Sequence, residues 1–476
     1  MEAPVQPPVP ASDSPPVIPH VPPGGSLTMR IRAARTGQRL LLDLSARLAD
    51  AGCLVTGMDV VEVAPTGLVV DVSVLLLDGG GGEAVAAAVE KDPVCTLVHV
   101  SDAVFLRHLG GKIEVMSRQP LRTRQDMSTI YTPGVARVCE ALARRPQDAW
   151  SLTMKGSAVA IVTDGSAVLG LGNLGPTAAL PVMEGKAAIF RTFAGLSAFP
   201  LCLNVTSIDD LVRATVALAP GFGGINLEDI AAPACFEVER RVQAEVDIPV
   251  FHDDQHGTAA VVMAGLISAS RLTGRAFPAL RVVVVGAGAA GTAISNALLD
   301  AGVTDLTIFD KDGVLRDAEG WSPHHRELAQ RTNPRSLTNL PEAFSNADAV
   351  IGTARRGSFE PALVERMAPR PLVFALANPD PEVFPHEVRP DAVIATGRSD
   401  LPNQINNSLC FPGFFKGALH ARARTVTPAM VRAAAAAIAD ATSDAQLSAG
   451  VIIPTMFQRG LHEAVAARVS AAVLPA

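Results

Sequence analysis

The spacing of hydrophobic residues divides the chain into segments with different expected structures. Residues 1–25 are rich in proline and show no hydrophobic periodicity, which predicts a disordered, polyproline-like tail. Between residues 26 and 105 the pattern predicts a short strand at 27–31, a helix that stops at Gly52, two strands, a short helix and a final strand. This order predicts a small α/β domain at the front of the chain.

The βαββαβ order of residues 26–105 is that of a ferredoxin-like fold. In this topology the segment resembles the ACT regulatory domain, a small-molecule sensor often attached to metabolic enzymes. The resemblance implies an effector site in this domain. A purely structural or dimerising module is the alternative interpretation.

The rest of the chain alternates strand and helix patterns, with a mixed α/β region at 106–255 and a longer alternation at 256–476. Four consecutive valines run into a G-x-G-x-x-G turn, a helical stretch follows, and the next strand ends at Asp310, nineteen residues after Gly291. Glycines in such a turn let backbone N–H groups approach a pyrophosphate, and the acid binds ribose hydroxyls. The segment therefore predicts a Rossmann-type dinucleotide-binding domain rather than a tight turn alone. The turn comprises Gly286, Gly288, Ala289, Ala290 and Gly291.

The charge beside the ribose bears on which dinucleotide binds. Asp310 repels a 2′-phosphate, which favours NAD. Lys311 beside it leaves NADP as the alternative.

Composition excludes several classes of protein. The 476 residues suggest about three folded units, and a net charge of −7 argues against a nucleic-acid binder. No uninterrupted apolar run reaches the roughly 20 residues that a membrane span needs. The start of the chain does not resemble a secretory signal, and six scattered cysteines are typical of reduced thiols. We therefore expect a cytoplasmic protein.

Candidate chemistry lies in polar clusters ahead of the dinucleotide turn. Glu228 and Asp229 follow an apolar, glycine-containing run, and Asp254 lies where a strand-like segment gives way to a helix. Three carboxylates without a cysteine are the ligands that Mg²⁺ or Mn²⁺ prefers. Either acidic pair alone is more typical of a solvated surface.

Two further residues are candidates for proton transfer. Tyr131 is the only tyrosine of the chain, and Lys186 lies in an otherwise apolar stretch. A lysine serves as a base near neutral pH only if its pKa falls by about three units from about 10.4, whereas tyrosine is a natural proton donor. Lysine at such a position commonly points to solvent instead.

Taken together, the motifs resemble the malic enzyme family in its compact bacterial form. They occur in family order over about residues 110–425. They are YTPGVA at 131–136, VTDGSAVLGLGNLG at 162–175, MEGKAA at 183–188, INLED at 225–229, FHDDQHGTA at 251–259, GAGAAG at 286–291, ANPDPE at 377–382 and PNQINNSLCFPG at 402–413.

The resemblance implies a role for each matching residue. Lys186 matches the general base, Asp253 its acidic partner and Tyr131 the acid that protonates the enolate. The metal ligands match Glu228, Asp229 and Asp254. Asn378 and Asn407 match the family's asparagines that contact the substrate near the nicotinamide, and Asn406 lies next to Asn407. The resemblance also places Asn378 among the residues that bind the cofactor.

One position departs from the family pattern. Larger eukaryotic members have a substrate-binding arginine where this chain has Ala167. Ser166, or backbone amides around Gly170 and Gly172, would have to hold the substrate carboxylate instead.

The resemblance implies oxidative decarboxylation of (S)-malate to pyruvate and CO₂ with reduction of NAD, oxaloacetate decarboxylation, and a homodimer or higher oligomer. Together with the composition of the tail, it divides the chain into four segments: the tail at 1–25, the ACT-like domain at 26–105, the catalytic N-terminal domain at 106–255, and the NAD-binding domain with C-terminal helices at 256–476.

Two other functional classes are alternatives to a malic enzyme. An amino-acid dehydrogenase does not account for three clustered carboxylates, and a ligand sensor with a decayed catalytic unit does not account for the retained base, acid and ligands.

Overall fold

The structure is a computed structural model that describes residues 25–64, 67–77, 81–108 and 110–473. The tail predicted for residues 1–25 lies outside the described residues except for Gly25. The chain forms two compact units, the first ending at Lys112 and the second beginning at Ile113. Each unit is described by itself.

The first unit is a four-stranded antiparallel sheet with helices packed on one face. The strand order is β2-β3-β1-β4. Alternate residues of β3 are buried, because the side chains of a strand point to opposite faces and only one face meets α1 and α2. The elements are β1 (Ser26–Ala33), α1 (Gln38–Asp50), β2 (Cys53–Ala64), β3 (Gly67–Leu76), α2 (Gly81–Glu90), β4 (Cys95–Asp102) and α3 (Ala103–Leu106). The predicted ferredoxin-like arrangement is confirmed, while the likeness to an ACT domain stays a prediction.

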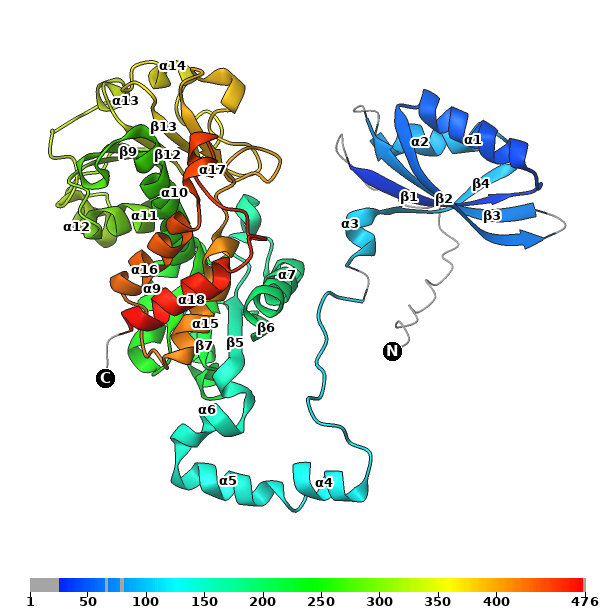
Figure 1. The fold of residues 1–476 in the computed structure, drawn as a ribbon, viewed down its shortest axis with the longest axis horizontal. Coiled ribbons are helices and arrows are strands. Elements are labelled where there is room, and N and C mark those ends of the chain that lie inside the picture. The colour runs from blue at the N-terminus through cyan, green and yellow to red at the C-terminus, as the bar shows by residue number, and fades with distance from the viewer. Residues whose placement is uncertain (1–24, 65–66, 78–80, 109, 474–476) are drawn as a thin grey trace. The chain divides into compact units, whose positions relative to one another are not determined.

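The second unit contains two parallel sheets (Figure 1). The smaller has the order β6-β5-β7-β8, and every residue of β5 is buried, as expected for a central strand covered on both faces. Its elements and the helices around it are α4 (Arg124–Ile130), α5 (Val135–Arg144), α6 (Ala149–Leu152), β5 (Ala158–Thr163), α7 (Pro176–Ala194), β6 (Ser197–Cys202), α8 (Ile208–Leu218), β7 (Gly224–Leu227), α9 (Ala234–Glu245) and β8 (Val250–His252).

The larger sheet has the order β11-β10-β9-β12-β13-β14 and is parallel except for β11 at one edge. This arrangement confirms the Rossmann-type prediction. Its elements are β9 (Arg281–Val285), α11 (Ala289–Asp300), β10 (Asp305–Asp310), β11 (Gly313–Val314), α12 (Pro323–Ala329), α13 (Leu340–Phe344), β12 (Ala349–Gly352), α14 (Pro361–Val364), β13 (Leu372–Ala375) and β14 (Val393–Thr396).

One helix joins the cores of the two sheets. α10 (Thr258–Thr273) buries eleven of its sixteen residues, and a single hydrophobic cluster includes residues of β5, α10 and β9. The last helices pack on the same core; they are α15 (Phe411–His420), α16 (Pro428–Asp440), α17 (Asp444–Ser448) and α18 (Leu461–Ala472). In the part of the chain that the structure describes, no helix is long and apolar enough to span a bilayer.

The separate hydrophobic cores predict that the second unit folds without the first. A fragment that begins at Ile113 should unfold cooperatively at a temperature close to one of the transitions of the full chain, because the core of the first unit contains only residues of that unit. Differential scanning calorimetry of both proteins checks this. A fragment without a cooperative transition would contradict it.

Candidate active site

The dinucleotide turn has the close packing that its glycines predict. A Cβ at Gly291 would lie 1.9 Å from the carbonyl oxygen of Gly286, so any other residue would clash there. A Cβ at Gly288 would meet nothing within 4 Å, which leaves the backbone at that point open to a ligand. Ala289 and Ala290 begin α11, and the Ala287 N–H donates to Asp310 Oδ1 at 3.4 Å. The turn therefore presents free space and a helix N-terminus beside a carboxylate.

Lys186 is a buried amine held between two carboxylates. Its side chain leaves α7, and Nζ donates to Glu228 Oε2 at 2.5 Å and to the carboxylate of Asp253. The same Nζ lies 4.4 Å from the centre of the Phe411 ring. This lysine does not point to solvent, so the interpretation of Lys186 as a surface residue is wrong.

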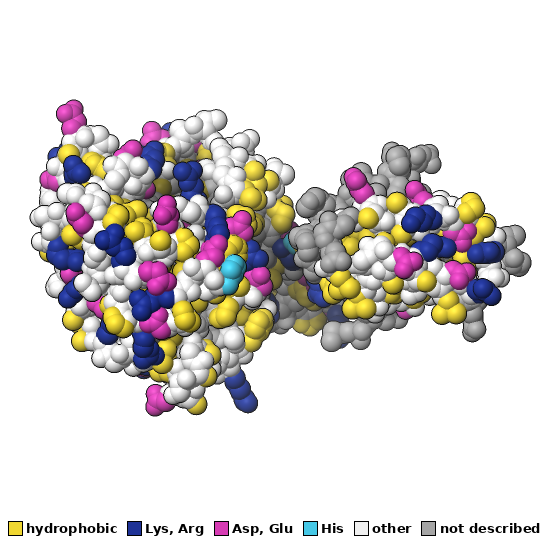
Figure 2. Space-filling model, turned by 90° about the horizontal axis from the view of Figure 1, so that it is seen from above, with side chains coloured by type: hydrophobic (Ala, Val, Ile, Leu, Met, Phe, Trp, Pro, Cys, Tyr) yellow, Lys and Arg dark blue, Asp and Glu magenta, His cyan; other side chains and the backbone are white. Residues whose placement is uncertain are grey.

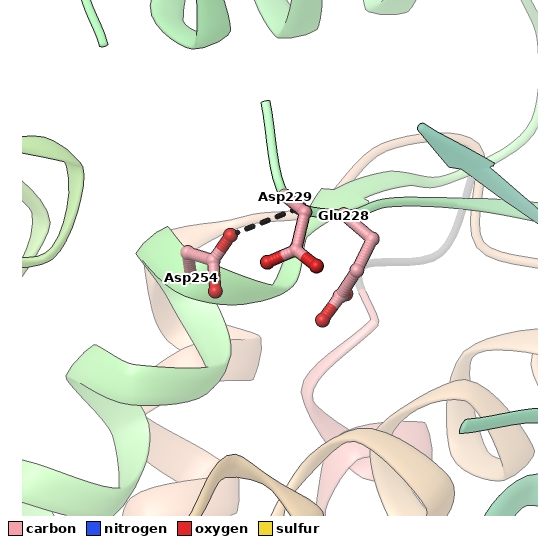
Figure 3. Close-up of side chains that lie close together, drawn as sticks. All are labelled: Glu228, Asp229 and Asp254. Atoms are coloured by element: carbon pink, nitrogen blue, oxygen red, sulfur yellow. Dashed lines mark hydrogen bonds between the residues drawn. The ribbon is translucent and has the colours of Figure 1, made fainter. Parts of the chain in front are cut away.

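Three carboxylates lie together beside this lysine. Oxygens of Glu228, Asp229 and Asp254 lie within 4.8 Å of one another. Figure 3 shows them turned toward a common point, with Asp254 Oδ2 accepting from the Asp229 N–H at 3.2 Å. The residues follow β7 and β8, whose carboxyl ends meet at the same edge of the smaller sheet.

The electrostatics of this cluster show an excess of buried negative charge. Burial raises the pKa of Glu228 and of Asp254. Burial, with Glu228 and Asp254 close by, raises the pKa of Asp229 to about 8. Burial also raises the pKa of Asp253 to about 6, although Lys186 opposes this shift. Burial would lower the pKa of Lys186, but Asp253 and Glu228 outweigh it and raise that pKa above its ordinary value.

The donor set fits a divalent cation. Asp229 Oδ2 is buried and has no hydrogen-bond partner among the described residues, and all three ligands offer hard carboxylate oxygens of the kind that Mg²⁺ and Mn²⁺ bind. A cation would balance the buried negative charge of the three carboxylates, whose pKa values are raised mainly by burial. Asn226 supports the cluster by donating from Nδ2 to Glu228 Oε2 at 2.9 Å.

The acidic pair Asp253 and Asp254 begins a π-helical turn that ends at Gly257. A Cβ at Gly257 would lie 1.9 Å from Asp253 Oδ1, so the turn brings the Asp253 carboxylate over a position that only glycine can occupy. Single π-turns of this kind are frequent at functional sites. The wider turn explains how two adjacent aspartates serve different partners, Lys186 for the first and the carboxylate cluster for the second.

Glu239 is a residue that the sequence analysis missed. It lies on α9, and its carboxylate accepts from the His252 N–H at 3.0 Å and from Gln255 Nε2 at 3.1 Å, while His256 Nε2 lies 2.7 Å from its Oε1. Glu239 therefore holds both sides of the turn that carries Asp253 and Asp254. Nothing in the sequence around Glu239 signals this role, because its partners lie more than ten residues away.

Loops from the two sheets meet beside the cluster. A Cβ at Gly170 would lie 3.3 Å from the carbonyl oxygen of Asn378, and a Cβ at Gly257 would lie 3.2 Å from Cβ of Asn407. Asn378 is exposed, and Asn406 and Asn407 are partly buried. The Asn406 side chain accepts from the Ser408 N–H, so this asparagine caps a short helix.

The loop with Ala167 wraps around Asp229. The Ala167 N–H donates to the carbonyl oxygen of Asp229 at 2.9 Å. Ser166 Oγ donates to Asp164 at 2.6 Å and accepts from the Ala231 N–H at 2.9 Å. The Ser166 hydroxyl is therefore engaged within the loop itself.

Tyr131 lies on an exposed segment of the second unit. It ends α4, its side chain is 64% exposed, and neither α4 nor α5 has a buried residue. In Figure 1 both helices stand away from the sheets of the unit. The predicted role of Tyr131 beside Lys186 stays a prediction.

Comparison with known proteins bears on the family. Residues 110–243 match the family model described as malic enzyme, N-terminal domain, and residues 255–474 match malic enzyme, NAD binding domain. An NAD-dependent malic enzyme of Geobacillus stearothermophilus is 47% identical over 89% of this chain and 89% of its own length.

The chain belongs to the malic enzyme family. A bifunctional malic/malolactic enzyme of Bacillus subtilis is 46% identical over 76% of this chain and 90% of its own length. Among solved structures, the NAD-dependent malic enzyme of Thermotoga maritima has a TM-score of 0.74 at 43% identity, covering 78% of this chain and 99% of that one.

The raised carboxyl pKa values predict that metal binding depends on pH. A proton on Asp229, whose pKa is raised to about 8, competes with a cation for the same oxygen. The increase in melting temperature that Mn²⁺ causes should therefore be larger at pH 8.5 than at pH 5.5, since binding to the folded state stabilises it.

Two variants distinguish Mn²⁺ binding at the carboxylate cluster from Mn²⁺ binding at other acidic residues. Asp254→Asn should abolish most of the Mn²⁺ effect, and Asp209→Asn, at an exposed residue of α8, should retain it. A Mn²⁺ effect that is equal at both pH values would contradict the prediction.

Proposed function

We propose that this protein oxidises (S)-malate with NAD and Mg²⁺ or Mn²⁺ and releases pyruvate and CO₂. The observation that carries the proposal is the buried Lys186, held by Glu228 and Asp253 beside the three-carboxylate cluster. The names of the Geobacillus and Thermotoga relatives support the reaction and the coenzyme. Decarboxylation of added oxaloacetate is proposed as a second reaction of the same site.

Lys186 is the proposed general base. Nζ accepts the C2 hydroxyl proton only when it is uncharged, and the two carboxylates now hold it protonated. Once Glu228 is committed to a cation, only Asp253 still favours the charged amine, so the pKa of Lys186 falls. Asp253, whose pKa is raised to about 6, lies in direct contact and can receive the proton in turn.

When bound, the dinucleotide would supply a hydride acceptor and the divalent ion would supply Lewis-acid polarisation of a carbonyl. Glu228, Asp229 and Asp254 would hold the ion. The turn at Gly286, Gly288, Ala289, Ala290 and Gly291, with Asp310 and Asn378, would hold the dinucleotide. Asn378, Asn406 and Asn407 would orient the substrate. Tyr131 would protonate C3 of the enolate after CO₂ departs.

Because Tyr131 lies apart from Lys186, we propose that a second copy of the chain supplies it in a homodimer. The segment around Tyr131 is unusual in its exposed apolar side chains, which mark an interaction surface. They are Ile113, Val115, Met116, Leu121, Met127, Ile130, Val138, Leu152 and Met154.

The surface charges bear on nucleic-acid binding, and the cysteines bear on the cellular location. Figure 2 shows basic and acidic side chains interspersed over the face drawn, which supports the absence of a nucleic-acid partner. All six cysteines are free thiols, which supports a cytoplasmic location. A small-molecule effector of the ACT-like domain remains part of the proposal.

Reduction of NAD by malate tests the function. Absorbance of the reduced coenzyme should grow with malate, Mn²⁺ and NAD and should stop growing when the metal is chelated. The kcat/KM for NADP should be lower than that for NAD.

The Lys186→Ala variant should lower kcat by about 10² to 10⁴, with partial rescue by small amines. Lactate should be measured beside pyruvate, since one relative is named malic/malolactic. Reduction of NAD by an amino acid without metal would identify an amino-acid dehydrogenase. Absence of NAD reduction under every condition would indicate a ligand sensor.

Mixing two inactive variants tests the shared site. Tyr131→Phe should lose pyruvate formation yet retain oxaloacetate reduction, and Lys186→Ala should lose oxidation. If each site combines Lys186 of one chain with Tyr131 of the other, an equimolar mixture allowed to exchange subunits should regain about a quarter of wild-type activity. Half of the dimers in such a mixture contain one chain of each variant, and each of these dimers has one intact site out of two. Recovery should be absent if the mixture is cross-linked before exchange. No recovery in an exchanged mixture would place both residues in one chain.

A further inference from the structure

A cavity of about 250 Å³ lies outside the candidate active site, in the second unit. α9, α10, α11, α12 and α16 enclose it together with the π-helical turn, and Figure 1 shows these helices gathered on one side of the unit. None of the residues predicted for catalysis, metal or dinucleotide lines it. An apolar cavity of about 150 Å³ is already large enough for benzene, so this one has room for a ring with a polar group attached.

The walls of the cavity are mostly apolar. Met263, Leu328 and Val431 are among the lining residues, together with small side chains of α10 and α11. The rings of Phe236 and His324 lie 4.3 Å apart on one side. Burial and His325 lower the pKa of His324 to about 4, so this ring is neutral near pH 7.

One basic group faces this apolar space without a partner. Arg432, in the first turns of α16, lines the cavity, is partly buried and has no hydrogen bond or ion pair within the described residues. The acid Asp300, by contrast, is held by Arg331 at 2.8 Å. Glu327 also lines the cavity, is exposed and is unpaired within the described part of the chain.

We propose that this cavity binds a small amphipathic carboxylate, with its apolar body against Met263, Leu328 and Val431 and its carboxylate on Arg432. An aryl or alkyl acid and an apolar α-amino acid share this chemistry. The amino acid adds an ammonium group, for which Glu327 is the available acceptor. The site goes beyond the proposed function, because it contains no group of the reaction.

The cavity has a direct connection to the metal ligands. Gln255 and His256 line it, and both contact Glu239, which also holds the backbone of His252. Asp253 and Asp254 lie between these contacts. A ligand that presses on Gln255 or His256 therefore changes the position of the Asp254 carboxylate, and we expect occupancy to change the apparent affinity for Mn²⁺.

Calorimetric titration of the full chain, without malate or NAD, tests binding independently of the proposed function. The probes are 3-phenylpropionate, its neutral analogue 3-phenylpropan-1-ol, and L-phenylalanine. The acid should bind at least about tenfold more tightly than the alcohol, the usual effect of a hydrogen bond to a charged group. Tighter binding of L-phenylalanine than of the acid would support the same site and assign Glu327 to the ammonium group.

Two variants and a control locate the binding. Arg432→Gln should weaken 3-phenylpropionate about tenfold, whereas Arg468→Gln, at an arginine of α18 paired with Asp440, should not. Ala297→Phe, which fills the cavity, should abolish binding and the shift in Mn²⁺ affinity while the melting temperature shows a folded protein. Arg432 is only partly buried, so we expect Arg432→Gln to fold. This variant still tests binding in the cavity if Ala297→Phe fails to fold.

Several results would overturn the proposal. They are equal binding of acid and alcohol, no effect of Arg432→Gln, or no measurable binding of any probe at millimolar concentration. Dissociation of the oligomer by Ala297→Phe would show instead that a second copy of the chain occupies the cavity.

Discussion

The structure of the site depends on the burial of Lys186 among carboxylates. An isolated ammonium group in the interior would cost several kcal/mol, and so would each isolated carboxylate. Contact with Glu228 and Asp253 offsets the cost for the amine, but Asp229 and Asp254 add more negative charge than one lysine can balance. Burial raises the pKa of Glu228, Asp229 and Asp254, and neighbouring carboxylates add to this shift. A divalent cation is the group that resolves the charge imbalance, because it neutralises the cluster and releases Lys186 from one of its two anionic partners.

This charge balance places strict demands on the backbone. The cluster combines residues after β7 with residues after β8, so the smaller sheet sets the distance between them. The π-helical turn then separates the directions of Asp253 and Asp254, and Gly257 leaves space for the first of these carboxylates. Glu239 fixes the same turn from outside. The polar groups around the lysine are therefore positioned by buried strand ends and by the turn that follows β8.

Much of this arrangement is predictable from the sequence, for identifiable reasons. The valine strand, the glycine turn and Asp310 predict the Rossmann-type sheet because their spacing is local. The carboxylate cluster is predictable because its acids follow apolar runs, which places them at strand ends. Glu239 is not predictable, since its partners come from a distant loop. The contact of Lys186 Nζ with two carboxylates, which raises its pKa, is not predictable either, because those carboxylates come from distant segments. The assigned roles themselves stay predictions, as do the domain boundaries.

The position of Tyr131 has the most consequence for how the reaction is organised. A sequence motif fixes which residue donates a proton but not which chain it comes from. α4 and α5 expose apolar side chains that a single chain leaves in water, and burial of such area favours association. In the proposed dimer the same contact that buries this surface also brings the phenol to the site. In that proposal, assembly also completes the site for the final proton transfer. The groups proposed for hydride transfer, namely Lys186, the carboxylate cluster and the dinucleotide turn, all belong to one chain. A monomer would consequently retain the oxidative half of the reaction and lose control of the enolate.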